Sequence, residues 1–198
     1  MRTANTDTVV VFLCEITKKL TMSAVLAAMG TVLLMIGAFI EALDLSMAAL
    51  ASFFCIFAVI EMGKGYPWMI YAVTGILSVV LMPQSLGGWV YILFFGYYPI
   101  LKEKIEKKNK LFSWIFKFLI FNAAVTLYAV ICFFFMFGEI EALLGEFSAL
   151  LGGIDTGALL ISIIYFVLNF VFVIYDLALT QLITLYFRKL RKKFKFLK

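Results

Sequence analysis

Asp176 is the residue of this 198-residue chain with the clearest capacity for chemistry, because it lies deep in an apolar run. It stands 12 residues before Arg188, about 18 Å along a helix from the basic end of that run. An ionisable side chain at such a depth is costly unless it is paired or wet, so it is a functional candidate. Three roles are open: hydrogen bonding to Tyr or Thr groups of a neighbouring helix, binding or sensing a substrate, and relaying a proton.

Further polar and aromatic residues occur on turns and helix ends at the acidic side of the chain, where a small-molecule pocket could combine aromatic walls with a few polar groups. We predict that the substrate-binding residues are Asp44, Gln84, Trp89, Tyr165, Asn169 and Asp176. Asp44 has a plainer alternative as the cap of the helix that follows it. Trp89 and Tyr91 have one as aromatic residues of the membrane interface. If Asp44 and Glu41 point inward, they favour a cationic or hydroxyl-rich ligand.

Several kinds of chemistry are excluded by what the sequence lacks. It has no histidine, and Cys14, Cys55 and Cys132 form no CxxC motif, which excludes His-based metal sites and Ser-His catalysis. There is no Gly-rich phosphate loop, so the chain cannot drive transport with ATP by itself. An aspartyl enzyme built on Asp44 and Asp176 is disfavoured because the two residues lie toward different depths. We predict no enzymatic activity and no cofactor.

The composition places these residues in a membrane. The chain is 65% hydrophobic with a mean hydropathy of +1.07, whereas soluble domains are about 45–50% apolar. We predict an all-α integral membrane protein, a six-transmembrane-helix bundle forming one polytopic domain over residues 1–198. The expected spans are 20–40, 45–62, 67–82, 89–101, 111–137 and 158–187. The third and fourth are short for a hydrocarbon core of about 30 Å and could instead form a re-entrant pair. The apolar rhythm of Glu139–Leu151 predicts helical structure that lies along the outer surface.

The charges of the connecting segments alternate along the chain. Basic residues occur at Lys18–Lys19, Lys64, Lys102–Lys110 and the tail 188–198, while the other connections are acidic or uncharged. This is the positive-inside pattern, which predicts that both termini are cytoplasmic. The net charge of +5 therefore indicates contact with anionic lipids at the cytoplasmic face and no nucleic acid.

Two charged residues near the inner ends of spans have simple expected roles. Lys117 is close enough to the inner surface for its side chain to snorkel to the headgroups. Glu61 lies near the inner end of the second span and is expected to pair with Lys64.

Small residues follow Lys18–Lys19 at helical spacing. Ala24 and Ala28 are one turn apart and share a face, and Ser23, Ala27 and Gly30 add small side chains nearby. Small residues at this spacing let another helix approach closely. The face packs either against other helices of this chain or against a separate membrane subunit.

This layout resembles the S components of energy-coupling factor (ECF) transporters. The resemblance rests on the length, the six spans with both ends inside, and the Ala24-xxx-Ala28 motif after Lys18–Lys19. The segments Leu43–Ser52 and Phe95–Lys102 and the pair Tyr175-Asp176 are also similar to bacterial members of that group.

The resemblance implies a substrate-specific binding subunit in a bacterial plasma membrane that captures a vitamin-like small molecule. Ala24 and Ala28 would contact a coupling transmembrane subunit that carries two ABC ATPases. No vitamin-specific signature is present, which leaves the substrate open. The alternative is a non-transporting membrane scaffold of cell-envelope assembly.

Overall fold

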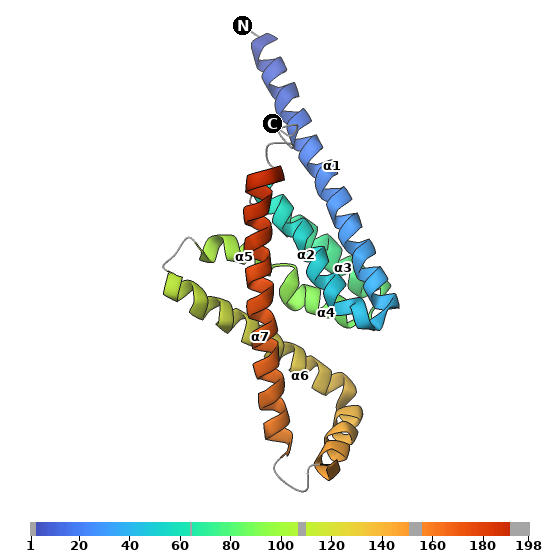
Figure 1. The fold of residues 1–198 in the computed structure, drawn as a ribbon. Coiled ribbons are helices and arrows are strands. Elements are labelled where there is room, and N and C mark those ends of the chain that lie inside the picture. The colour runs from blue at the N-terminus through green and yellow to red at the C-terminus, as the bar shows by residue number, and fades with distance from the viewer. Residues whose placement is uncertain (1–2, 64, 107–109, 151–155, 191–198) are drawn as a thin grey trace. The chain divides into compact units, whose positions relative to one another are not determined.

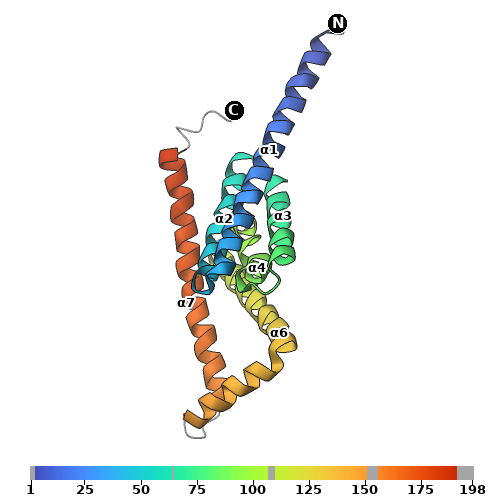
Figure 2. The same cartoon turned by 90° about the vertical axis from the view of Figure 1, so that its right-hand side faces the viewer.

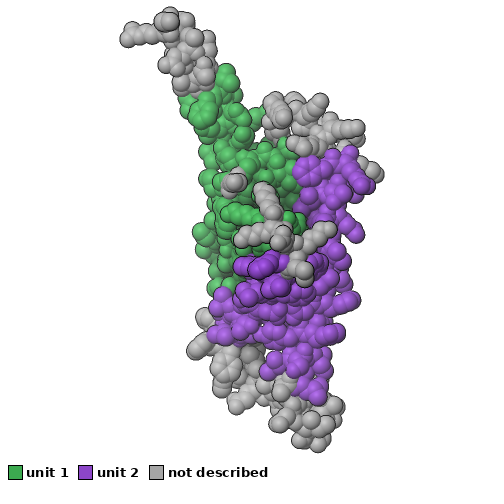
Figure 3. All heavy atoms as spheres, turned by 90° about the vertical axis from the view of Figure 1, so that its left-hand side faces the viewer, with its two compact units in different colours: residues 1–107 green, residues 108–198 purple. Residues whose placement is uncertain are grey.

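The computed structural model describes residues 3–63, 65–106, 110–150 and 156–190, and over these ranges the chain is helical with no strand (Figures 1 and 2). The predicted all-α class is therefore confirmed. Within the described residues, four helices are long and apolar enough to cross a membrane: Val10–Phe39, Asp44–Glu61, Phe112–Cys132 and Ile161–Arg188. The chain divides into two compact units, residues 1–107 and 108–198, which Figure 3 colours separately.

The core of the first unit is a packed group of three helices. Helix α1 (Thr3–Phe39) packs on α2 (Asp44–Glu61) and α3 (Tyr66–Leu81), and a short 3₁₀ turn, Glu41–Leu43, joins α1 to α2 (Figure 1). The buried side chains where these helices meet include many small ones. They are Leu26, Ala27, Leu34, Ala48, Ala51, Cys55, Ala58, Met62 and Ile70, with Tyr91 from a later segment. Small side chains bring helix backbones close together, and dispersion contacts replace the driving force that water supplies to soluble proteins.

The connection from α2 to α3 is tight because of its residue types. Gly63 has a φ of 90°, a left-handed backbone conformation that glycine adopts without a Cβ penalty. Pro67 lies in the first turn of α3, as the sequence predicts, because a helix leaves its first N–H groups unbonded and loses nothing to proline there. The expected pairing of Glu61 with Lys64 lies outside the described residues.

The sequence predicts one span over residues 89–101, but this segment is not one continuous α-helix. The segment is divided into α4 (Leu86–Val90), a π-helical turn η2 (Tyr91–Phe95) and α5 (Tyr98–Ile105). Pro99 lies in the first turn of α5, where it begins a new helix, because proline has no N–H with which to continue an earlier one.

The backbone groups at this interruption are bonded within the unit. The Gly96 N–H donates to the Tyr91 carbonyl oxygen, five residues back, at 2.8 Å. The Ile92 carbonyl, which lies four residues back, accepts from the Tyr71 hydroxyl of α3 at 2.9 Å. A carbonyl group left without its helical partner needs another donor where water is excluded, and here a tyrosine hydroxyl provides it.

The second unit consists of two long helices. Helix α6 runs from Lys110 to Leu150, and α7 runs from Thr156 to Leu185 and ends in a π-helical turn, Tyr186–Leu190 (η3). The 41 residues of α6 would extend about 62 Å if straight, and its ribbon changes direction part-way along (Figure 2). The sequence predicts that the fifth span ends at residue 137 and that Glu139–Leu151 is helical. Helix α6 continues through Gly138 to Leu150, so the helical form is confirmed for residues 139–150. The surface position of Glu139–Leu151 stays a prediction, since side chains 133–150 lie outside the described part.

Candidate functional site

Polar side chains of the second unit line the contact between α6 and α7. Lys117, Asn122 and Thr126 project from α6, and Asp176, Asn169 and Tyr165 meet them from α7. We refer to these six residues as the α6–α7 seam. The spacings of seven and four residues place Asp176, Asn169 and Tyr165 on one side of α7, and their contacts with the three α6 residues form three layers.

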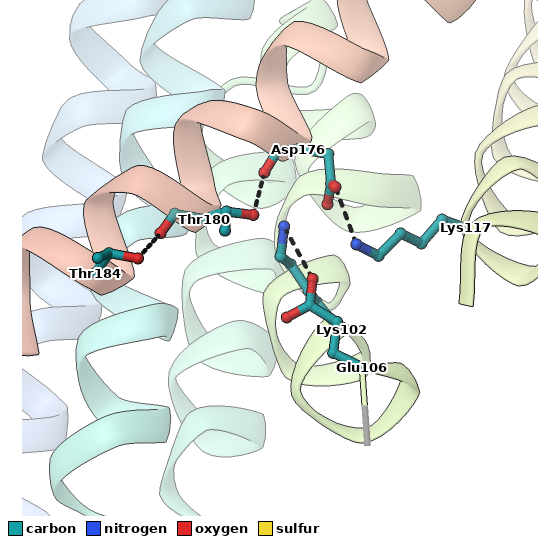
Figure 4. Close-up of polar contacts among 6 residues, drawn as sticks. All are labelled: Lys102, Glu106, Lys117, Asp176, Thr180 and Thr184. Atoms are coloured by element: carbon teal, nitrogen blue, oxygen red, sulfur yellow. Dashed lines mark hydrogen bonds and ion pairs between the residues drawn. The ribbon is translucent and has the colours of Figure 1, made fainter. Parts of the chain in front are cut away.

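The first layer is a buried ion pair. Lys117 Nζ lies 2.9 Å from Asp176 Oδ2, with 4% of the lysine and 2% of the aspartate exposed (Figure 4). The lysine ammonium also lies 5.4 Å from the centre of the Trp114 ring, within range of a cation–π attraction. The prediction that Lys117 snorkels to the inner surface is wrong. An opposite charge at hydrogen-bonding distance stabilises a carboxylate buried inside a helix, and Lys117 supplies it to Asp176.

The second layer is a reciprocal amide pair. Asn122 Nδ2 donates to Asn169 Oδ1 at 3.1 Å, and Asn169 Nδ2 donates to Asn122 Oδ1 at 3.1 Å. The second N–H of each amide donates within its own helix, to the Phe118 carbonyl at 2.9 Å and the Tyr165 carbonyl at 2.8 Å. Phe172, which follows Asn169 toward the ion pair, stacks on Phe121 with ring centres 4.5 Å apart.

The third layer is a pair of hydroxyl groups. Thr126 Oγ1 and Tyr165 Oη lie 2.9 Å apart, and Thr126 Oγ1 also donates to the Asn122 carbonyl at 2.8 Å. A threonine hydroxyl has one proton, so Tyr165 must be the donor to Thr126. Further along α7, Thr180 and Thr184 donate to carbonyl oxygens one turn earlier in their own helix (Figure 4).

In the first unit, Asp44 forms a compact group of hydrogen bonds with Ser85 and Gly87 at the start of α4, which we call the Asp44 knot. The Ser85 hydroxyl lies 3.1 Å from both carboxylate oxygens of Asp44, and the Gly87 N–H donates to Oδ2 at 2.8 Å. The Ser85 hydroxyl oxygen in turn accepts from the Gly88 N–H at 3.2 Å as the N-cap of α4. Asp44 is 5% exposed. The alternative prediction that Asp44 caps α2 is wrong, because α2 begins at Asp44 itself and its N-cap, Leu43, makes no side-chain cap bond.

The other predicted site residues of this unit differ in exposure. Gln84 is exposed, and the Trp89 indole N–H donates to the Pro83 carbonyl at 2.9 Å. Tyr91 is fully buried and its hydroxyl lies 3.3 Å from Cys55 Sγ, so the prediction of a membrane-interface position is wrong for Tyr91. The structure thus places Asp44, Gln84 and Trp89 in the first unit and Tyr165, Asn169 and Asp176 in the second.

The small residues of α1 divide between two faces. Ser23 and Ala27 are buried, the Ser23 hydroxyl lies 3.3 Å from Met62 Sδ, and a Cβ at Gly30 would lie 3.1 Å from Thr74. Ala24 and Ala28 are exposed. The paired-alanine face is therefore not covered by the other helices of the first unit, and both predicted roles for it stay predictions.

The charged end of α5 departs from the expected lipid-binding patch. Lys102 is 1% exposed and its Nζ lies 3.5 Å from Glu106 Oε1 (Figure 4), so Lys102 does not belong to a lipid-facing surface. Lys104 is exposed and its Nζ lies 6.0 Å from the centre of the Trp68 ring. Among the residues that the structure describes, no group of three or more His, Cys, Asp or Glu side chains could hold a metal ion.

The predicted site omits five residues of these clusters: Ser85, Gly87, Lys117, Asn122 and Thr126. The sequence does offer a signal for Ser85, since serine is a preferred N-cap residue and an apolar run begins at Trp89. Lys117 carries one too, because a carboxylate as deep as Asp176 needs a cation on a facing helix. Gly87 has no signal in the sequence alone. Its role follows from the fold, because a side chain there would overlap the Asp44 carboxylate.

Comparison of the chain with protein-family models, with curated proteins and with solved structures gives no match.

Proposed function

We propose that this chain is the substrate-binding subunit of an ECF-type importer in a bacterial plasma membrane. It captures a vitamin-like small molecule, docks on a coupling transmembrane subunit, and depends on two ABC ATPases for the work of transport. The observation that carries the proposal is the division of small residues on α1. Ser23, Ala27 and Gly30 are used inside the first unit, whereas Ala24 and Ala28 are left on an exposed face.

The exposed alanine face suits close packing against a helix of another protein. An alanine pair one turn apart lets a second helix come near enough for backbone and side-chain dispersion contacts. The pair lies five and nine residues after Lys19, so it is about 8 and 14 Å from the basic end of the helix. A partner helix docked there is near the cytoplasmic face, where ATPases act.

The proposed topology has six crossings with both termini in the cytoplasm. The alternation of basic with acidic or uncharged connections supports it. The four long apolar helices supply four crossings. The other two are α3 and the interrupted segment from α4 to α5, which are short enough to need shielding by longer neighbours.

The polar seam between α6 and α7 supports a binding role in the same protein. Polar side chains within apolar helices are retained at a cost and usually line a substrate pathway or hold helices together. Tyr165, Asn169 and Asp176 belong to this seam, and Gln84 and Trp89 lie beside the Asp44 knot.

Affinity purification of the tagged chain from its native membrane, followed by mass spectrometry, tests the proposal. We expect a coupling membrane protein and an ABC ATPase pair to co-purify, and Ala24→Trp or Ala28→Trp to reduce their recovery at least about tenfold. The matched control is Met29→Trp, since Met29 is also exposed but lies about 100° around α1 from Ala28. Full recovery with both alanine variants contradicts the docking role. Recovery of envelope-assembly proteins without an ATPase supports the scaffold alternative.

A further inference from the structure

The amide layer of the α6–α7 seam lies in the apolar middle of a helix. Asn122 is ten residues from each end of the candidate span Phe112–Cys132. Lipid chains offer no hydrogen bonds at such a position, so every bond that these polar atoms form must come from protein or from a bound molecule. The bonds already formed therefore define what a bound molecule can add.

The amide donors are fully used. Each asparagine side chain has two N–H donors and an oxygen with two lone pairs. The four N–H groups of Asn122 and Asn169 donate to one another's oxygen and to the carbonyls of Phe118 and Tyr165. Each amide oxygen accepts one of these bonds and keeps a second lone pair.

In the hydroxyl layer, too, the donors are used and acceptor capacity remains. The Thr126 proton is used on the Asn122 carbonyl, and the Tyr165 proton is therefore used on Thr126. Tyr165 Oη keeps its capacity to accept. The group is also accessible, because Asn122, Tyr165 and Asn169 are half-buried and Thr126 is exposed. Four neighbouring side chains thus offer hydrogen-bond acceptors and no further donor.

Charge narrows the class of ligand. The Asp176 carboxylate already lies 2.9 Å from the Lys117 ammonium, so a cationic ligand would have to compete with this lysine. A charged ligand in the middle of an apolar helix would lose its hydration without gaining a counter-ion. Asp44, the sequence-based candidate for a cationic ligand, uses its carboxylate on Ser85 and Gly87.

We propose that Asn122, Thr126, Tyr165 and Asn169 bind an uncharged small molecule that donates hydrogen bonds through two neighbouring O–H or N–H groups. This inference rests on the proposed function for its biological meaning, since it names the substrate class of that binding subunit. It adds Asn122 and Thr126 to the residues expected from the sequence, and it excludes the cationic ligand.

Three probes of nearly the same shape test the class of ligand. They are cis-cyclohexane-1,2-diol, its dimethyl ether, which has no donor, and protonated 2-aminocyclohexanol, which has donors and a positive charge. The full chain is placed in lipid nanodiscs, and saturation-transfer NMR measures the binding of each probe. We expect transfer to the diol, and at least about tenfold weaker binding of both the ether and the ammonium probe, a ratio that corresponds to about 1.4 kcal/mol.

Two variants locate the binding. Asn122→Leu combined with Asn169→Leu removes both amides without leaving one unpaired, and should abolish transfer to the diol. Tyr165→Phe removes one acceptor with the amide pair intact, and should weaken binding several-fold. Thr184→Val is the matched control, because Thr184 is an exposed residue of α7 whose hydroxyl bonds only its own helix. Circular dichroism checks that each variant keeps its helix content.

No transfer to the diol, equal transfer to the ether, equal transfer to the ammonium probe, or full binding by the double leucine variant would each overturn the inference. The failure of the proposed function is distinguishable. Loss of ATPase recovery with selective diol binding intact removes the importer and leaves the site. Normal ATPase recovery without selective diol binding removes the substrate class and leaves the importer.

Discussion

Asp44 and Asp176 are two carboxylates of nearly equal burial that the protein stabilises in different ways. Asp44 is 5% exposed and accepts from a serine hydroxyl and a glycine N–H at the first turn of α4. Asp176 is 2% exposed and lies beside a lysine ammonium. The first is neutralised by dipoles and the second by a full opposite charge.

The positions of the two residues in their helices explain the difference. Asp44 begins α2 and faces the first residues of α4, so free N–H groups and the positive ends of two helix dipoles are within reach. Asp176 lies inside α7, where the backbone N–H groups are already bonded within the helix. A carboxylate at a helix end can be held by backbone, whereas one in mid-helix requires a cation from a neighbouring helix.

The largest effect expected from this difference follows from removing one member of the ion pair. Lys117→Met should lower the free energy of unfolding by about 3–5 kcal/mol, because it leaves a buried carboxylate without its counter-ion. Adding Asp176→Leu to it should restore most of that loss. Unfolding of the purified protein in mixed micelles by increasing denaturing detergent measures both.

The exposed pair Lys19–Glu15 on α1 is the matched control for charge removal. Its Nζ–Oε1 distance of 2.7 Å is as short as that of the buried pair, but Glu15 is 61% exposed. Lys19→Met should therefore leave the free energy of unfolding almost unchanged, because water screens an exposed pair. A Lys117→Met effect as small as this would show that Asp176 does not depend on the lysine.

Steric disruption of the Asp44 knot should have the next largest effect. A Cβ at Gly87 would overlap the Asp44 carboxylate and lie 2.7 Å from its backbone oxygen. Gly87→Ala should therefore cost about 1–3 kcal/mol, as overpacking does elsewhere. The control is Gly88→Ala, where the nearest contact would be an ordinary 3.4 Å to Ser78 Oγ. Thermal unfolding in detergent compares the two, and equal midpoints would contradict the knot.

Replacing each aspartate with asparagine removes the charge and keeps the shape, so it compares how strongly each site depends on a negative charge. Asp44→Asn keeps an oxygen that accepts from Ser85 and Gly87, so the cost should be about 1 kcal/mol, the difference between charged and neutral hydrogen bonds. Asp176→Asn leaves the Lys117 ammonium buried without a counter-ion and should cost clearly more. Unfolding of the two variants under one condition tests the order, and a reversed order would contradict the distinction.

The smallest expected effect concerns the interrupted segment of the first unit. Tyr71→Phe removes the hydroxyl that bonds the Ile92 carbonyl, at a cost of about 0.6 kcal/mol, typical of hydrogen bonds between membrane helices. Hydrogen exchange at the Gly96 amide should become faster, since the π-helical turn loses its support. Unchanged exchange would indicate that the turn is stable without Tyr71.

Sequence periodicity and composition predicted α2, α3 and α7 with their approximate ends, because apolar length and turn residues act locally. Helix α1 begins at Thr3, well before the expected span 20–40. Pro67 and the acidic turn before Asp44 marked boundaries that the structure keeps. The π-helical turn at Tyr91–Phe95 could not be predicted, because it depends on a hydroxyl from Tyr71, 21 residues away from Ile92. The fifth span was predicted to end at residue 137, whereas helix α6 continues through Gly138, since one glycine costs a helix only about 1 kcal/mol.

A site residue could be predicted from the sequence when its own polarity is costly in an apolar helix. It could not be predicted when its role depends on which distant residue the fold brings near. Asp176 and Asn169 could be selected from the sequence because polar groups in apolar helices are expensive. The partners of Asp176 and Asp44 could not, since Lys117 and Ser85 are 59 and 41 residues away and only the fold brings them near.

The division of small residues on α1 has a consequence for how the chain can change over evolutionary time. Gly30 faces Thr74 of the same unit, so a larger residue at either position selects for a compensating change at the other within one gene. Ala24 and Ala28 face outward, so on the proposed function their substitutions would be compensated in a different gene. Neighbouring positions of α1 would then co-evolve with different partners: Gly30 with residues of this chain, and Ala24 and Ala28 with residues of the coupling subunit.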